Sequence, residues 1–458
     1  MKRTAVLNVV GLTSGLVEQM PRLRQFTSTR HLRSVVPAFP AVTCTAQSTS
    51  LTGLTPAGHG IVGNGWYDRD LAEVHFWKQS NHLVHGRKLW EELREQIPGF
   101  TCAKLFWWYN MYSTADYSIT PRPIYPADGR KIFDVYTAPF DLRCAIKKDL
   151  GEFPFRSFWG PGAGIASSRW IAESAKWIEE RYRPSLSLVY LPHLDYNLQK
   201  IGPNDPRIAA DLQLLDDLLG ELISFFEERE IQLVILSEYG ITPVDNPIHI
   251  NRVLRQQGWI TIKDELGLEM IDCGASKVFA VADHQVAHVY VNDRSLLDQA
   301  RSVLESQAGV ESVLDRNQQV ARGINHPRAG NLVAVADQRS WFTYYYWLDD
   351  AVAPDFARTV DIHRKIGYDP AELFIDPAIK FPAARVTAFL LKKKLGLRAL
   401  LEVVPLDATL VKGSHGRVPE SAENHPVIIC DQLTAHPTDE IKAADVYGLL
   451  RAACLGAA

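Results

Sequence analysis

A dense run of hydroxyl side chains is the first feature of the sequence that could do chemistry. Seven threonines and serines fall within the thirteen positions 43–55. Four glycines lie between residues 53 and 63, and Asn64 follows them. So many hydroxyls and glycines together predict a loop that binds a ligand. A hydroxyl is a weak nucleophile at neutral pH, so it needs a neighbouring base or a metal ion before it can attack a substrate.

Acidic groups that could serve such a hydroxyl stand at the ends of predicted strands. Short apolar runs predict buried strands at 4–12, 186–195 and 231–240. A 3.6-residue apolar period predicts a helix at 206–229, between the last two strands. This order of strand, helix and strand predicts a parallel sheet covered by helices, in which ligands bind at the carboxyl ends of the strands. Asp195, Glu238 and Tyr239 occupy two of those ends.

Several short motifs, in a fixed order, make the hydroxyl-rich segment resemble a known family. The motifs read FPAVT, TGLTP and HGIVGN, and the likeness continues in LDYNLQKIGP, ILSEYGI and KGSHG. The segment resembles the nucleophile region of the nucleotide pyrophosphatase/phosphodiesterases in the alkaline phosphatase superfamily. The resemblance implies that Thr43 is the nucleophile and that Asn64 contacts the phosphoryl oxygens of the substrate. It also implies an α/β fold, an alkaline phosphatase-like core with a mostly parallel central sheet flanked by helices.

The metal positions of that family are only partly kept in this chain. In the resembled family, carboxylates and histidines at strand ends hold two metal ions, which activate the threonine and stabilise the leaving oxygen. Here Val10 stands where the resemblance implies an aspartate, and Gln199 and Tyr239 stand where it implies histidines. Glu238 stands beside Tyr239 in place of an aspartate. The side chains that can still bind a metal are those of Asp195, Glu238 and His415.

Three interpretations of this altered site stay open. In the first, the site holds one divalent metal, zinc foremost or else manganese or iron, through Asp195, Glu238, His415 and, as a further candidate, His363. In the second, other side chains rebuild a metal site, with candidates at His193, His249, Asp283, His284, His288 and Asp361. In the third, no metal takes part, Glu238 or His415 is a general acid or base, and Tyr239 donates a proton. The predicted catalytic residues are thus Thr43, Asn64, Glu238 and Tyr239, and the predicted substrate contacts are Asn64 and Gln199.

Changes in composition along the chain predict its organisation. We expect the first part of the core at 1–254, a small inserted α+β cap at 255–350 and a return to the core at 351–458. The aromatic and proline-rich residues 100–165 predict an elaborated loop region near the site, and 341–350 predict an aromatic strand. The tract 385–404 is both basic and apolar, which predicts a surface helix.

The overall composition bears on two kinds of partner, nucleic acid polymers and membranes. The chain has 458 residues and a formal net charge of −4, which gives no sign of a surface for a nucleic acid polymer or of membrane insertion. Its six cysteines contain no CxxC pair, and no apolar run approaches the roughly 18 residues of a membrane-spanning helix. The scattered cysteines and the absence of a signal-like start predict a cytoplasmic protein. The family resemblance implies that its partner is a small anionic metabolite.

Together these features predict a hydrolase-like enzyme. We expect it to act on a phosphate ester, or on a phosphodiester or pyrophosphate metabolite, through a threonine nucleophile beside an altered metal centre. The alternatives are a non-hydrolytic binding or scaffold protein, or a metal-independent biosynthetic enzyme, built on a degenerate phosphodiesterase fold. The altered positions Val10, Gln199 and Tyr239 favour the binding or scaffold protein, and the metal-independent enzyme lies between that alternative and the hydrolase.

Overall fold

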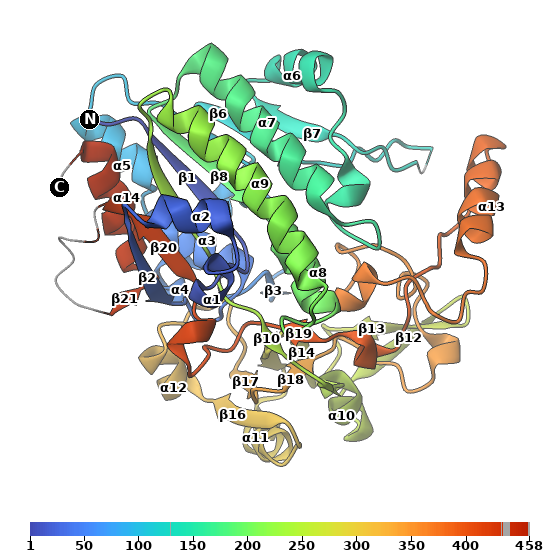
Figure 1. Cartoon of the computed structure of the whole chain (residues 1–458). Helices are drawn as coiled ribbons and strands as arrows, with labels where there is room; N and C mark the ends of the chain where they lie inside the picture. Colours follow the sequence, from blue (N-terminus) through green and yellow to red (C-terminus); the bar gives the residue numbers. More distant parts are fainter. Residues whose placement is uncertain (129, 432, 434–439, 457–458) are drawn as a thin grey trace.

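A nine-stranded sheet forms the centre of the molecule (Figure 1). The computed structural model describes the whole chain except residues 129, 432, 434–439 and 457–458. Five neighbouring strands of the sheet, β9, β1, β8, β5 and β6, run parallel, and antiparallel pairs lie toward both edges. In spatial order the strands are β21 (Ile441–Lys442), β2 (His31–Val36), β20 (Val427–Cys430), β9 (Gln232–Leu236), β1 (Thr4–Val9), β8 (Leu186–Leu191), β5 (Cys102–Leu105), β6 (Tyr117–Pro121) and β7 (Val135–Ala138).

Helices cover both faces of this sheet, as the apolar strands require. The central strand β1 is buried along its whole length, so each face of the sheet needs a covering layer. Figure 1 shows α7 and α9 crossing one face, while α3, α5 and α14 lie on the other. The helices of this layered core are α1 (Ser14–Val17), α2 (Pro21–Thr27), α3 (Thr43–Thr52), α4 (Pro56–His59), α5 (Leu89–Gln96), α6 (Leu142–Leu150), α7 (Ile165–Tyr182), α8 (His193–Lys200), α9 (Ile208–Glu227) and α14 (Asp445–Leu455).

A second, smaller layer lies below the carboxyl ends of the parallel strands (Figure 1). Its four-stranded antiparallel sheet has the order β14 (Val278–Asp283), β15 (Val286–Val291), β17 (Leu332–Ala336) and β16 (Val310–Leu314). Its helices are α10 (Ile250–Gln256), α11 (Leu297–Glu305) and α12 (Arg316–Ala321). This sheet falls inside the predicted cap segment 255–350, whose boundaries stay a prediction.

Short paired strands complete the regular structure. They are β3 (Gly65–Asp68) with β4 (Glu73–Phe76), β10 (Thr242–Pro243) with β19 (Gly413–Ser414), β11 (Asn246–Ile248) with β18 (Ser340–Phe342), and β12 (Thr261–Glu265) with β13 (Leu268–Asp272). A last helix, α13 (Pro382–Lys394), projects away from the body of the molecule (Figure 1). Among the described residues, no helix is both long and apolar enough to cross a membrane.

Several sequence predictions of local structure are wrong. The hydroxyl-rich segment predicted as a loop forms the helices α3 and α4. The strand predicted at 186–195 ends at Leu191, so Asp195 lies in the first turn of α8 and not at a strand end. The surface helix predicted at 385–404 ends at Lys394.

Two further predictions differ from the structure in the number and length of strands. Residues 100–165 are more than a loop region, because they contribute β5, β6 and β7 to the main sheet, as well as α6. Those strands are only four or five residues long, and Lys104 in β5 is fully buried, so the sequence shows no strand-like pattern there. The predicted aromatic strand at 341–350 is reduced to the three residues of β18, 340–342.

A buried ion cluster fixes the segment that follows the second layer. The Lys365 ammonium lies 2.7 Å from a carboxylate oxygen of Asp369 and 2.7 Å from one of Glu372, and all three side chains are buried. The indole N–H of Trp159 donates to the other Glu372 oxygen at 2.6 Å. The cluster therefore ties residues 365–372 to the core.

Replacement of Lys365 by methionine is expected to lower the free energy of unfolding by about 3–5 kcal/mol, because two buried carboxylates lose their counter-charge. Urea denaturation of the variant measures this loss. Lys393→Met, at an exposed position of α13, is the matched control and should leave the unfolding midpoint unchanged. A change below about 1 kcal/mol for Lys365→Met would show that the cluster is not a net source of stability.

Candidate active site

Thr43 is the first residue of α3, and its side chain is buried at the carboxyl edge of the central sheet. Backbone N–H groups and the positive end of the helix dipole gather at such a helix start and attract anions. The next residue, Cys44, donates its backbone N–H to the Asn64 side-chain oxygen at 3.0 Å. The segment before α3 is fixed by His415, whose ring N–H donates to the Ala41 carbonyl at 2.7 Å. A phosphate group bound here would meet a helix N-terminus.

The Thr43 hydroxyl is linked to a carboxylate through a phenol. Its oxygen lies 3.0 Å from the Tyr239 hydroxyl, and that hydroxyl donates to Asp195 at 3.2 Å. The Gln199 amide donates to the other Asp195 oxygen at 2.9 Å and accepts from the Tyr368 hydroxyl at 2.9 Å. Because the Tyr239 proton points at Asp195, the Tyr239 oxygen can accept the Thr43 proton.

Glu238, the residue before Tyr239, is bound by two side-chain amides, and the Thr43 hydroxyl is also close enough to affect its pKa. One of its oxygens accepts from the Asn8 amide at 2.5 Å and from the Gln47 amide at 2.6 Å. Gln47 is oriented in turn by the backbone N–H of Trp108, which donates to its side-chain oxygen at 2.7 Å. Within the described residues, the second Glu238 oxygen is buried and has no hydrogen-bond partner. Such an atom is available to a ligand.

Four rings form a column that begins at Tyr239, with two stacked pairs joined by a tilted contact between His415 and His284. Tyr239 stacks on His415 with ring centroids 3.6 Å apart and an interplanar angle of 7°. His284 follows at 3.6 Å from His415, and Tyr368 follows at 3.7 Å from His284. Tyr239 and Tyr368, at the two ends of the column, are the residues that hydrogen-bond to Asp195 and Gln199. The column therefore fixes the directions of both phenol groups.

The turn between β14 and β15 of the second layer reaches into the site. Asp283 accepts the Asn64 backbone N–H at 2.7 Å and the Asn64 amide at 3.0 Å. The next residue, His284, has a positive φ of 61° and supplies the third ring of the column. One N–H of the Asn64 amide is left for a ligand, so its predicted contact with a phosphoryl group stays a prediction.

Burial sets the protonation of the site. It raises the pKa of the Asp195 carboxyl to about 7 and that of the Glu238 carboxyl to about 8, because removal from water disfavours the charged form. The same effect lowers the pKa of His415 to about 3. At neutral pH the site thus holds a neutral imidazole, a Glu238 that keeps its proton and an Asp195 that exchanges one.

The raised pKa of Glu238 predicts a pH-dependent stability. Between its unfolded value near 4.5 and about 8, the native state binds more protons than the unfolded state, so this group makes the free energy of unfolding fall as pH rises. Glu238→Gln removes that penalty, and its oxygen can still accept from Asn8 and Gln47. The variant should gain stability over the wild type as pH rises from 5 to 8, by on the order of 4 kcal/mol.

Chemical denaturation at pH 5, 6, 7 and 8 measures this difference, with Glu265→Gln on an exposed hairpin as the control. A difference that stays constant with pH would contradict the assignment of a raised pKa to Glu238.

The structure brings most of the predicted site residues together and leaves some histidines outside. The residues that meet in one network are Thr43, Asn64, Asp195, Gln199, Glu238, Tyr239 and His415. The histidines that have other partners are His363 with the Phe76 carbonyl (3.3 Å), His193 with Asp211 (3.1 Å), His249 with Thr343 (2.8 Å) and His288 with the Val62 carbonyl (2.9 Å).

The sequence alone does not assign four members of the network to it. Gln47 and Tyr368 carry no motif, and the sequence marks His284 only as a candidate metal ligand. Asn8 is separated from the expected ligand position by two residues, but its register with Leu236 in β9 places it near Glu238. An uncharged polar residue inside an otherwise apolar strand is the signal that could have found it.

The residues present do not fit a two-metal centre. Within the part of the chain that the structure describes, no three histidine, cysteine or acidic side chains lie close enough to hold a metal ion. Val10 offers no donor atom, and the oxygens of Asp195 accept from Tyr239 and Gln199 instead. The Tyr239 hydroxyl lies between the Thr43 hydroxyl and the Asp195 carboxylate and hydrogen-bonds to both.

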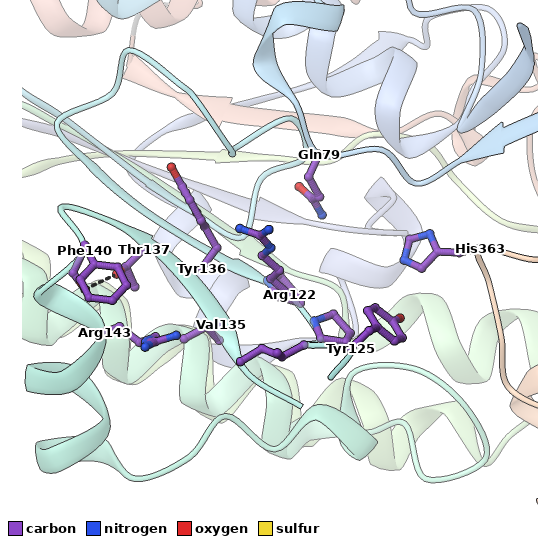
Figure 2. Close-up of a pocket in the computed structure, with 12 residues that line it drawn as sticks. Gln79, Arg122, Tyr125, Val135, Tyr136, Thr137, Phe140, Arg143 and His363 are labelled. Carbon is purple, nitrogen blue, oxygen red and sulfur yellow. Dashed lines mark hydrogen bonds between the residues drawn. The ribbon is translucent and has the colours of Figure 1, made fainter. Parts of the chain in front are cut away.

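A cavity of about 670 Å³ lies between β6, β7 and two segments that are far apart in the sequence, one with Gln79 and one with His363 (Figure 2). Figure 2 shows Arg122 between Tyr136 on one side and Tyr125 and His363 on the other. Phe140 lies 5.0 Å from the Arg143 guanidinium, and Asp134 pairs with Arg143. The cavity therefore combines aromatic rings with a cation, Arg122, that has no salt bridge within the described residues.

This cavity is connected to the network around Thr43. Trp77, two residues before Gln79, packs against Trp108 with ring centroids 4.7 Å apart. The Trp108 N–H orients Gln47, which donates to Glu238. These contacts, together with the backbone between Trp77 and Gln79, link the segment of Gln79 to the Glu238 carboxyl.

A family model supplies the wider comparison. The model for type I phosphodiesterases and nucleotide pyrophosphatases matches residues 4–369, from β1 to the segment of Tyr368. The chain belongs to this family. The match confirms the resemblance that the motifs indicate, and with it the expectation of a chain related to phosphodiesterases and pyrophosphatases.

Two related proteins match about half of this chain. An uncharacterized pyrophosphatase/phosphodiesterase of Schizosaccharomyces pombe is 25% identical over 251 residues, which are 50% of this chain and 44% of that protein. A venom phosphodiesterase of Macrovipera lebetinus is 23% identical over 252 residues, or 51% of this chain and 25% of that protein. The chain therefore matches less than half the length of these relatives.

Solved structures confirm the predicted fold class. Phosphonoacetate hydrolase of Sinorhizobium meliloti, in complex with phosphonoformate, superposes with a TM-score of 0.60 at 15% identity, covering 100% of this chain and 96% of that one. A murine ectonucleotide pyrophosphatase/phosphodiesterase, in an inactive form with AMP, gives 0.59 at 14% identity and covers 99% and 95%. The fold is thus the α/β alkaline phosphatase-like core.

Proposed function

We propose that the chain hydrolyses a phosphate ester, phosphodiester or pyrophosphate bond of a small anionic metabolite, with Thr43 as the nucleophile and without a resident metal. The observation that carries the proposal is the hydrogen-bonded series Thr43–Tyr239–Asp195 at the N-terminus of α3. Membership of a phosphodiesterase and nucleotide pyrophosphatase family supports the reaction class. A threonine-to-alanine substitution in the inactive murine relative supports a role for threonine in this fold.

In the first step, Thr43 attacks the phosphorus atom. As the bond between its oxygen and phosphorus forms, the Thr43 proton passes to the Tyr239 oxygen, and the Tyr239 proton passes to Asp195. The bond from phosphorus to the leaving oxygen breaks, and that oxygen takes the electron pair and the proton of Glu238. A carboxyl with a raised pKa is suited to give up this proton near neutral pH.

In the second step, water releases the phosphoryl group from Thr43. The ionised Glu238 takes a proton from the water as the water oxygen attacks phosphorus. The Thr43 oxygen leaves and recovers its proton from Tyr239, which is reprotonated by Asp195. The cycle returns every group to its starting state and consumes one water molecule.

The cavity beside β6 and β7 supplies a place for the organic part of the substrate. Its rings, Tyr125 and Tyr136, offer stacking surface, and Arg122 offers a cation for a second anionic group. Arg122→Ala is expected to raise KM about tenfold or more, while kcat changes less than twofold. Steady-state kinetics measure both constants, with Arg207→Ala, on another surface, as the control. An unchanged KM would place the substrate elsewhere.

A second candidate function, a non-hydrolytic binding protein, is favoured by one specific observation. Thr43, Asp195, Glu238 and Tyr239 are each less than a tenth exposed, and most of their polar atoms are paired with one another. A protein that has lost catalytic activity would keep such a buried hydrogen-bonded network if the network stabilises the fold.

Hydrolysis assays separate the two candidates. The purified chain is incubated with bis-p-nitrophenyl phosphate, p-nitrophenyl phosphate and a dinucleotide pyrophosphate, and ³¹P NMR follows the products. Turnover by the wild type supports the enzyme. No turnover of any compound, combined with tight binding of one of them, would favour the binding protein.

A further inference from the structure

The segment 377–402 leaves the body of the molecule and returns to it at nearly the same point. The Asp376 backbone N–H donates to the Val403 carbonyl at 2.7 Å, so the two ends of the excursion meet. Between them, α13 projects outward and makes no part of any core (Figure 1). Not one of the thirteen residues of α13 is buried. A helix without buried residues contributes nothing to the core of its own chain.

The excursion exposes a set of large apolar side chains that is unusual for a soluble surface. Their exposed fractions lie between 43% and 75%. The side chains are Phe381, Leu390, Leu391, Leu395, Leu397 and Leu400. Single exposed apolar residues are common on proteins, whereas a local group of this kind marks a surface that binds something.

Four of the apolar residues follow the period of a helix face. Ala384, Ala388 and Leu391 are spaced at i, i+4 and i+7, which places them in one stripe along α13, and Leu395, its C-cap residue, continues the stripe at i+11. The other large apolar residues, Val386, Phe389 and Leu390, lie on the other side of the helix, where Val386 and Phe389 are half-buried. On a helical projection, Lys392 and Lys394 fall on opposite sides of this stripe. A narrow apolar stripe bordered by lysines is the pattern of a helix that lies in the interface of a membrane.

The charge of the excursion selects the kind of membrane. Residues 377–402 contain six basic side chains and one acidic one, Glu402, although the whole chain has a net charge of −4. Arg385 pairs with Glu402, and no other basic side chain of the excursion has an acidic partner among the described residues. Unpaired cations beside exposed leucines complement anionic lipid headgroups above an apolar layer.

We propose that the excursion 377–402 docks the protein on lipid surfaces rich in anionic headgroups, with the α13 stripe in the interface and the lysines at the headgroups. This attachment is independent of the proposed hydrolysis at Thr43. It needs no membrane-spanning helix, in agreement with the lack of one among the described residues.

Vesicle co-sedimentation tests the proposal on the full chain. The probes are vesicles of phosphatidylcholine alone and of phosphatidylcholine mixed with phosphatidylglycerol, at low and at high salt. The wild type should sediment with the mixed vesicles at low salt and be released at high salt, because surface charges are screened. Leu391→Gln/Leu395→Gln and Lys392→Gln/Lys394→Gln should each lower the bound fraction roughly tenfold.

The control is Leu266→Gln/Lys148→Gln, which changes the same residue types at exposed positions outside the excursion. It should bind like the wild type. The proposal is overturned if the wild type stays in the supernatant with mixed vesicles at low salt, or if it binds neutral vesicles equally well. Equal binding by the stripe variants would overturn it too. So would size-exclusion chromatography that shows a dimer which Leu391→Gln/Leu395→Gln dissociates, because the stripe would then be an interface between copies of the chain.

Discussion

Thr43→Ala should reduce kcat for a hydrolysed phosphodiester by about 10⁴-fold or more, because the side chain that forms the covalent bond is removed. The fold should survive, since the loss of one side-chain hydrogen bond to Tyr239 costs about 1 kcal/mol. Thr43→Ser keeps the hydroxyl and should retain measurable turnover. Stopped-flow or ³¹P assays of the three proteins, together with their unfolding midpoints, give the comparison.

Two results would contradict this account of Thr43. Retained turnover in Thr43→Ala would remove this residue from the mechanism and leave direct attack by water. Equal loss in Thr43→Ser and Thr43→Ala, with both proteins folded, would show that the threonine methyl group, and not the hydroxyl, is what the site requires.

The second large expected effect is a loss of activity when Asp195 is replaced by asparagine. Asp195→Asn keeps the shape of the side chain and an oxygen that can accept from Tyr239, but it cannot take up the proton that Tyr239 relays. Its kcat should fall by about 10²–10⁴-fold. The wild-type rate should rise with pH as Asp195 ionises near its pKa of about 7, and that rising limb should vanish in the variant.

Asp216→Asn is the matched control for this substitution. Asp216 is also buried, but it accepts the backbone N–H groups of Arg22 and Leu23, away from the site. It should change stability and leave the pH profile of the remaining activity as it is. Should Asp195→Asn lose activity in parallel with one equivalent of bound zinc, measured by mass spectrometry, the metal-binding interpretation would replace the proton relay.

The sequence was sufficient to predict the main framework. The runs at 4–12, 186–195 and 231–240 predicted β1, β8 and β9 because strands buried on both faces are continuously apolar. The sequence does not predict the strands within residues 100–165. They are short, and Lys104 interrupts the apolar pattern of β5. Its ammonium donates to the Tyr109 carbonyl at 2.8 Å, a partner that no local pattern reveals.

The candidate site could be predicted only where its residues form motifs. Thr43, Glu238 and His415 stand in short signatures, so their proximity was an inference from the family resemblance. Gln47 sits among hydroxyl residues without a signature of its own, and Tyr368 lies far along the chain from Gln199, which it orients. Such contacts are made by the fold and have no fixed sequence spacing.

The sequence places Val10 and Gln199 at two positions where the family resemblance implies metal ligands, but it does not reveal which contacts Asp195 makes. The structure adds that Tyr239 lies between Thr43 and Asp195, held by its stack on His415. A large aromatic ring can take this position because the ring column gives it a wall to pack against.

The most direct test of the central claim is to trap the covalent intermediate. The wild type is mixed with a substrate that has a fast leaving group, quenched with acid within milliseconds and digested for mass spectrometry. The account predicts that the phosphoryl group is attached to Thr43 in the peptide that contains FPAVTCTAQ, and that Glu238→Gln alters how much accumulates. Turnover without any modified peptide, or a phosphoryl group attached to another residue, would contradict it.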